Sequence, residues 1–161
     1  MQVRIVAVGT LREPHWQAAA REYLKRLQPY ARVEVVEVKE EPLPELGLTA
    51  EEAAARRREG ERILAILAKP PRTHLVALDV QGQELSSEGL ADYLAKSALE
   101  GQPSVAFVIG GASGLAPEVL TAANLRLSLS RLTLPHQLAR VVLLEQLYRA
   151  FKIMRREPYH R

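Results

Sequence analysis

Short apolar runs alternate with segments of helical periodicity along most of this chain, and that alternation restricts its possible folds more than any other feature. Val3–Val8 and Ser104–Ile109 are almost continuously apolar, which suits strands covered on both faces. Between such runs, apolar residues recur three or four positions apart, the period of an α-helix. The predicted strands are 3–8, 33–38, 74–80 and 104–109, and the predicted helices are 14–27, 49–69 and 87–98. This pattern is typical of an α/β fold with a mostly parallel sheet flanked by helices.

The chain has 161 residues, the length of one ordinary domain. No repeat or linker divides it, so we expect a single domain over residues 1–161. The absence of cysteine excludes disulfides and thiolate metal sites, and the four histidines show no metal-ligand spacing, so we expect no metal. The first apolar run is too short for a signal peptide, and no run approaches the roughly 20 apolar residues of a membrane span. We therefore expect a soluble, cytoplasmic protein without membrane contact.

Positive charge gathers toward the C-terminus. Residues 126–161 hold eight Lys or Arg side chains against Glu145 and Glu157, a local charge of +6 in a chain whose net charge is +3. Such asymmetry is expected of a protein that binds the phosphate backbone of a nucleic acid. A solvated helix face produces the same pattern, so both interpretations stay open.

A glycine turn follows the predicted strand 104–109. Gly110, Gly111 and Gly114 lie just before Pro117, a residue suited to the first position of a helix. Ligands of parallel sheets bind outside the carboxyl ends of strands, where Gly9 and the segment from Asp79 to Gly82, with a turn expected at Gln81-Gly82, also fall. The glycines lack the G-x-G-x-x-G spacing of dinucleotide sites. The turn is therefore either a site for a nucleotide-like ligand or a tight connection without one.

The segment from Leu125 to Arg131 alternates apolar and polar residues, which predicts a strand with one buried face. After Pro135, a helix is predicted from His136 to about Arg155. Its apolar surface is wider than one stripe. We expect this surface to be covered either by the core or by a second copy of the chain in a homodimer.

Two groups of side chains in the last third could act on a substrate. His136 and Arg140 are four residues apart and share a helix face, and an imidazole near the glycine turn could contact a substrate. Tyr159, His160 and Arg161 end the chain, and such rings and guanidinium groups can stack on an unpaired base. We expect this tail to be disordered without substrate.

The motifs together resemble the SPOUT-class methyltransferases, specifically the RlmH type, which methylates N3 of a pseudouridine in 23S rRNA. The resemblance covers essentially the whole chain. The motifs that carry it are Val6-Ala7-Val8-Gly9, Ala77-Leu78-Asp79, Val108-Ile109-Gly110-Gly111, Leu132-Thr133-Leu134-Pro135-His136, Leu147-Tyr148-Arg149-Ala150 and Pro158-Tyr159-His160-Arg161.

The resemblance implies a SPOUT-type α/β knot, with a C-terminal trefoil knot over about residues 104–161. It implies S-adenosyl-L-methionine as methyl donor, 23S rRNA of the assembled 70S ribosome as substrate, and a homodimer in which one tail approaches the other cofactor. By position, it implies cofactor contacts at Leu78, Gly110, Leu129, Ser130, Arg131, Leu132, Thr133 and Leu134. It also implies roles in positioning the base or accepting its proton for His136, Arg140, Tyr159 and His160.

The residues alone leave two other functions open. One is a nicotinamide- or flavin-dependent α/β oxidoreductase that uses residues 110–114 as its phosphate turn, although the dinucleotide fingerprint is missing. The other is a ribosome- or RNA-binding protein without catalysis.

Overall fold

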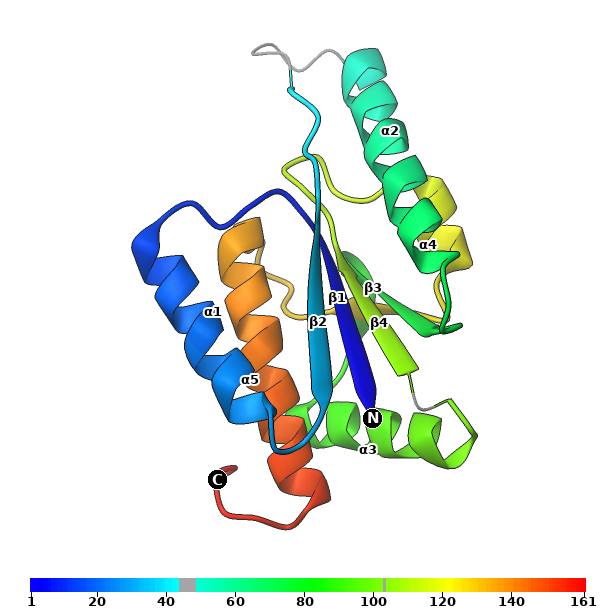
Figure 1. Cartoon of the computed structure of the whole chain (residues 1–161). Helices are drawn as coiled ribbons and strands as arrows, with labels where there is room; N and C mark the ends of the chain where they lie inside the picture. Colours follow the sequence, from blue (N-terminus) through cyan, green and yellow to red (C-terminus); the bar gives the residue numbers. More distant parts are fainter. Residues whose placement is uncertain (44–48, 103) are drawn as a thin grey trace.

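The computed structural model describes residues 1–43, 49–102 and 104–161. In these residues a five-stranded parallel sheet, in the order β2-β1-β4-β3-β5, has helices on both faces (Figure 1). The strands are β1 (Gln2–Val8), β2 (Arg32–Val38), β3 (His74–Glu84), β4 (Ser104–Ile109) and β5 (Leu125–Ser128). The helices are α1 (Pro14–Leu27), α2 (Thr49–Leu67), α3 (Ser87–Leu99), α4 (Pro117–Ala122) and α5 (His136–Met154). The predicted layered α/β fold is confirmed, and the trefoil knot stays a prediction.

Two apolar cores separate the sheet from its helices. Along β1, Val3, Ile5 and Ala7 belong to the core shared with α1, α3 and α5, whereas Val6 and Val8 belong to the core shared with α2 and α4. None of these five side chains is more than 1% exposed. The continuous apolar run of the sequence therefore supplies both faces of a central strand, since successive side chains of a strand point to opposite sides.

Helix α5 packs between α1 and α3 on one face of the sheet. Its buried apolar side chains join the core on that face. They are Leu143, Leu144, Leu147, Ala150 and Phe151. The core of one chain therefore covers most of the wide apolar surface that the sequence predicts for this helix.

The turn predicted at Gln81-Gly82 is wrong, because β3 continues through it as an irregular strand. Pairing between β3 and β5 shifts register between Leu78 and Gln83. Glycine permits this irregularity, since a Cβ on Gly82 would lie 2.6 Å from the carbonyl oxygen of Arg126. The close approach of two main chains thus lengthens β3 to Glu84.

Strand β5 is shorter than the alternating sequence predicts, ending at Ser128 instead of near Arg131. The Ser128 hydroxyl donates to the carbonyl oxygen of Ser130 at 3.0 Å, and Ser130 Oγ accepts from the main-chain nitrogen of Leu132 at 2.9 Å. Serine side chains that bond to nearby main chain compete with strand pairing. The chain therefore leaves the sheet and forms a loop that leads to α5.

Helix α2 contains a buried carboxylate that no sequence pattern singles out. The Glu59 side chain is 4% exposed. Its Oε2 accepts from the main-chain nitrogen of Glu41 at 2.9 Å, and its Oε1 has no partner among the described residues. Burial raises the pKa of Glu59, and the carboxylates of Glu40 and Glu41 add to this effect. The charged form of this side chain is therefore less favourable in the folded protein than in the unfolded chain.

We expect Gly82→Ala to lower the free energy of unfolding by about 1–3 kcal/mol, because the added methyl overlaps the Arg126 carbonyl oxygen. Urea unfolding measures the change. Gln81→Ala, at the exposed neighbouring position, is the control. Equal stability of the two variants would show that the main chains do not approach as closely as described.

We expect the free energy of unfolding of Glu59→Gln to rise relative to that of the wild type as pH increases from about 4 to about 8. A carboxyl group whose pKa is higher in the folded state than in the unfolded state stabilises the fold at a pH below its unfolded pKa of about 4.3. This stabilisation is lost as the pH rises through the folded pKa. Glutamine carries no charge at either pH. Thermal unfolding across this range measures the difference, with the exposed Glu61→Gln as control. The same pH profile in both variants would contradict the assignment.

Candidate functional site

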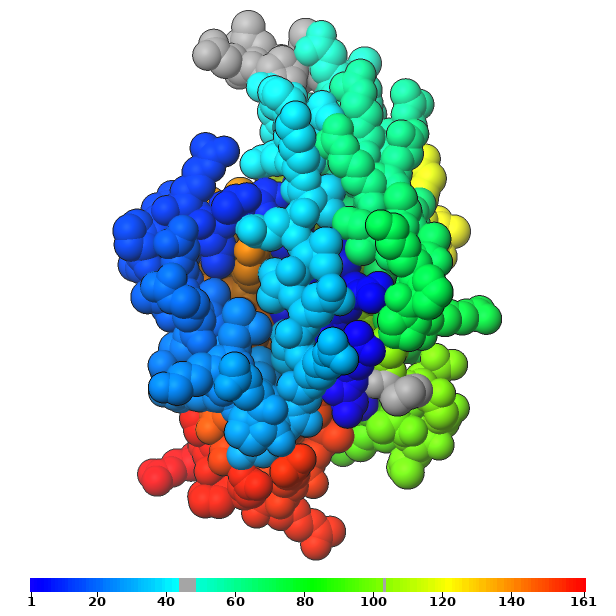
Figure 2. Space-filling view, in the orientation of Figure 1, coloured from blue at the N-terminus to red at the C-terminus, as the bar shows by residue number. Residues whose placement is uncertain are grey.

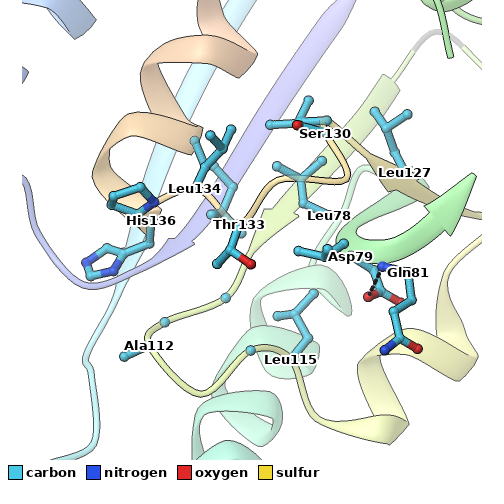
Figure 3. Close-up of a pocket in the computed structure, with 18 of the residues that line it drawn as sticks. Leu78, Asp79, Gln81, Ala112, Leu115, Leu127, Ser130, Thr133, Leu134 and His136 are labelled. Atoms are coloured by element: carbon cyan, nitrogen blue, oxygen red, sulfur yellow. Dashed lines mark hydrogen bonds between the residues drawn. The ribbon is translucent and has the colours of Figure 1, made fainter. Parts of the chain in front are cut away.

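A cavity of about 720 Å³ opens at the carboxyl ends of β3, β4 and β5 (Figure 3). Most of its lining comes from three chain segments: the irregular part of β3 from Leu78 to Gln81, the turn from Ile109 to Leu115, and the loop before α5. Leu120, Leu127, His136 and Ala139 complete the lining. Its volume is that of a site for a small molecule or cofactor. The structure therefore places this cavity where ligands bind in parallel-sheet folds.

The glycine turn after β4 forms one wall of this cavity from main chain. The nitrogen of Gly114 donates to the carbonyl oxygen of Gly111 at 3.1 Å, and Gly114 has a φ of +80°. A Cβ on Gly110 would lie 2.8 Å from the main-chain carbon of Gly114. The turn can therefore close in this form only with glycine at position 110.

Helix α2 holds the same turn from outside. The guanidinium of Arg56 donates to the carbonyl oxygen of Ser113 at 3.2 Å. Further along α2, a Cβ on Gly60 would lie 2.9 Å from the Cβ of Ala116, so the helix approaches the residues after the turn very closely. These contacts fix the position of the cavity wall.

Seven of the eight residues predicted to contact the cofactor line this one cavity. They are Leu78, Gly110, Leu129, Ser130, Leu132, Thr133 and Leu134. Arg131 is the exception, since its side chain is 87% exposed and lies 3.8 Å from the carboxylate of Glu84. The structure thus brings together residues from three distant segments, while their contact with a cofactor stays a prediction.

His136 and Arg140, at the start of α5, have different surroundings. His136 lines the cavity (Figure 3). Arg140 is 4% exposed and lines a smaller cavity of about 320 Å³ between α1, β2 and α5. Its guanidinium donates to the Glu37 carboxylate at 2.9 Å and to the carbonyl oxygen of Gly9 at 3.0 Å. Arg140 therefore ties the end of β1 to α5, beside the first cavity.

The C-terminal tail is ordered, so the prediction of disorder is wrong. The Tyr159 hydroxyl donates to Glu145 at 3.1 Å, and the Arg149 guanidinium lies 4.8 Å from the centre of the Tyr159 ring. The ring nitrogens of His160 lie 3.2 Å from Arg149 and 2.7 Å from the Glu88 carboxylate. Burial, together with the Glu145 carboxylate, raises the pKa of Tyr159 to about 12. Contacts between distant residues hold the tail against α5 and α3.

Tyr159 and His160 lie away from His136, beside the middle and the second half of α5. Their partners Glu145 and Arg149 are about 14 and 20 Å along the helix from His136. Figures 1 and 2 show the tail at the end of the molecule away from the first turns of α2. Within one chain, the structure therefore separates the four predicted substrate-contacting residues into two groups.

Neither metal-binding groups nor membrane-spanning helices occur in the part of the chain that the structure describes. No three His, Asp or Glu side chains there come together in a way that could hold a metal ion. No helix there is long and apolar enough to cross a membrane.

Known proteins are similar to this chain in sequence, and a solved structure is similar to it in fold. A family model described as "Predicted SPOUT methyltransferase" matches residues 1–160. Two relatives, each named "Ribosomal RNA large subunit methyltransferase H", come from Symbiobacterium thermophilum and Carboxydothermus hydrogenoformans. They are 51% and 49% identical to this chain over 161 residues, which is 100% of each protein.

A solved structure shows the same fold at low sequence identity. It is that of a probable methylase family protein from Haemophilus influenzae Rd KW20, with a TM-score of 0.59 and 14% identity, and the match covers 99% of this chain and 70% of that one. The sequence matches extend over the same length as the motifs and confirm the resemblance drawn from them. The chain belongs to the SPOUT methyltransferase family and, within it, to the RlmH type.

Proposed function

We propose that this protein uses S-adenosyl-L-methionine to methylate N3 of a pseudouridine in 23S rRNA of the assembled 70S ribosome. Family membership and the names of the full-length relatives support rRNA methylation. The observation that carries the proposal is the cavity at the ends of β3, β4 and β5, with its wall of glycine main chain. A cytoplasmic location follows from this substrate.

The residues around the cavity fit a nucleoside cofactor. Leu78, Leu115 and Leu127 offer apolar surface to an adenine ring, and the turn at Gly110 leaves main-chain groups accessible. We expect Leu78, Gly110 and the stretch 129–134 to hold the cofactor, Arg131 through its main chain. The cofactor supplies a methyl group that a positively charged sulfur has already activated.

The protein's own task is to align the target base and to take up the proton of its N3 atom. The His136 ring lines the cavity, and we expect it to accept this proton. Its Nε2 lies 3.7 Å from the position of a Cβ on Gly9. Because Arg140 binds the Gly9 carbonyl oxygen, Arg140 keeps this strand end in place beside the ring.

A second copy of the chain completes the site in this proposal. Tyr159 and His160 contact Glu145 and Arg149, which lie about 14 and 20 Å along α5 from His136, so we expect them to reach a cavity through a homodimer. In that arrangement the tail of one subunit positions the base beside the cofactor of the other. The proposal takes residues 1–161 as one domain, with the knot over about 104–161 and no metal.

Exposed arginines near the tail would contact the rRNA phosphates. Arg155, Arg156 and Arg161 are exposed at this end of the molecule. Each phosphate that a cation neutralises releases counterions, which favours binding.

Family membership favours this reaction over an oxidoreductase and over a non-catalytic RNA-binding protein. Transfer of tritium from methyl-labelled S-adenosyl-L-methionine to ribosomes that lack the modification tests it, with mass spectrometry of the rRNA to locate the methyl group. We expect label at N3 of one pseudouridine. Ribosomes that stay unlabelled, or binding of NAD without binding of S-adenosyl-L-methionine in calorimetry, would overturn the proposal.

We expect Gly110→Val to reduce affinity for S-adenosyl-L-methionine by more than about tenfold. The branched side chain would collide with the main chain of Gly114 and displace the turn, at a cost above about 1.4 kcal/mol. Titration calorimetry measures the affinity. Ala53→Val, at an exposed position of α2, adds similar bulk away from the cavity and should bind normally. Normal binding by Gly110→Val would contradict the placement of the cofactor.

We expect deletion of Tyr159–Arg161 to leave the fold and cofactor binding intact but to abolish methyl transfer. The deletion removes contacts to Glu145 and Glu88, and neither of these residues lines the cavity of the same chain. Calorimetry and tritium transfer measure the two properties. Tyr159→Phe keeps the ring on Arg149 and loses only the hydroxyl, so it separates packing from chemistry. A truncated protein with full activity would show that the tail has no part in the reaction.

A further inference from the structure

Asp79 is the only carboxylate that lines the cavity among the described residues. It lies in the irregular part of β3, directly after Leu78, and the other titratable side chain of the lining is His136. Figure 3 shows the two on opposite sides of the view, with Leu78 and Thr133 between them. The cavity thus has an acid on one side and an imidazole on the other.

The Asp79 carboxylate keeps free bonding capacity. Its Oδ1 accepts from the main-chain nitrogen of Gln81 at 3.1 Å, and no other bond to it is formed within the described residues. An ionised carboxylate only accepts hydrogen bonds, and its two oxygens can accept about four. Apolar side chains such as Leu115 and Leu127 share the lining. A ligand with hydrogen-bond donors fits this side of the cavity better than one without them.

We propose that Asp79 is a specificity-determining contact for the methyl donor and accepts hydrogen bonds from a group that presents several donors together. This inference rests on the proposed function and goes beyond the contacts expected from the family resemblance. S-adenosyl-L-methionine has two such groups, the vicinal hydroxyls of its ribose and the ammonium of its methionine part. Main-chain atoms of the glycine turn would hold the ring system, while Asp79 selects for the polar part.

Titration calorimetry with two ligands tests this contact. S-adenosyl-L-homocysteine has both donor groups, and 5′-methylthioadenosine keeps the ribose hydroxyls but lacks the ammonium. Asp79→Asn keeps an oxygen that can accept from Gln81, so the local turn survives, but it loses the charge and part of the accepting capacity. Glu118→Gln, at an exposed position of α4, makes the same charge change away from the cavity.

We expect Asp79→Asn to weaken binding of S-adenosyl-L-homocysteine by about 10- to 100-fold, the range for a lost hydrogen bond to a charged group. Its melting temperature should equal that of the wild type. The same loss with 5′-methylthioadenosine assigns the contact to the ribose hydroxyls, and a loss confined to S-adenosyl-L-homocysteine assigns it to the ammonium. Glu118→Gln should bind both ligands normally.

Unchanged affinity of Asp79→Asn for both ligands, where the wild type binds them, would overturn this inference and leave the proposed function standing. Weaker binding that appears only together with a lower melting temperature would also overturn it, since Asp79 would then only shape the strand. A wild-type protein that binds neither ligand would overturn the proposed function and this contact with it.

Discussion

The parallel pairing of the five described strands directs every strand toward the same edge of the sheet, and burial of both faces keeps the central strands β1 and β4 in register. A shift of one residue would move Val3, Ile5 and Ala7 to the opposite core. Because the register is fixed, the irregular part of β3 and the segments after β4 and β5 come together although they are far apart in sequence. The cavity is a consequence of this convergence and needs few side chains of its own.

Polar groups buried around the cavity connect its loops to the helices. Arg140 joins the end of β1 to α5, Arg56 joins the glycine turn to α2, and Glu59 joins α2 to the segment after β2. Each contact restrains a loop that the sheet alone would leave free. Burial raises the pKa of Glu59 although the hydrogen bond from Glu41 lowers it, so burial of this carboxylate, and not the contact itself, opposes stability as pH rises.

The layered α/β fold could be predicted from sequence because burial on two faces leaves a direct signal, as in the apolar run of β1. The ends of β3 and β5 could not, because they depend on the approach of Gly82 to another main chain and on local serine bonds. Family motifs identified seven residues that line the cavity. The sequence places Asp79 near the expected ligand site, but neither its free bonding capacity nor the burial of Glu59 could be predicted, since a single carboxylate shows its surroundings only in three dimensions.

The tail was the least predictable part, because residues distant in sequence hold it. Glu88 of α3 and Glu145 of α5 contact His160 and Tyr159 across gaps that no local pattern spans. Aromatic rings also meet there, with Tyr148 and Tyr159 centred 4.7 Å apart. An expectation of fraying considers only the chain end itself and ignores what the rest of the fold presents to it.

The contacts of the basic side chains change how the charge of the last third should be understood. Of its cations, Arg140 is buried against Glu37, Arg149 binds Glu145 and Lys152 binds Glu157. An ion pair inside the molecule contributes little to the electric field that a distant polyanion experiences. Long-range attraction thus depends on fewer of these cations than the sequence contains. Discrimination among RNA surfaces would then come from shape at short range, and RNA binding would have a modest sensitivity to ionic strength.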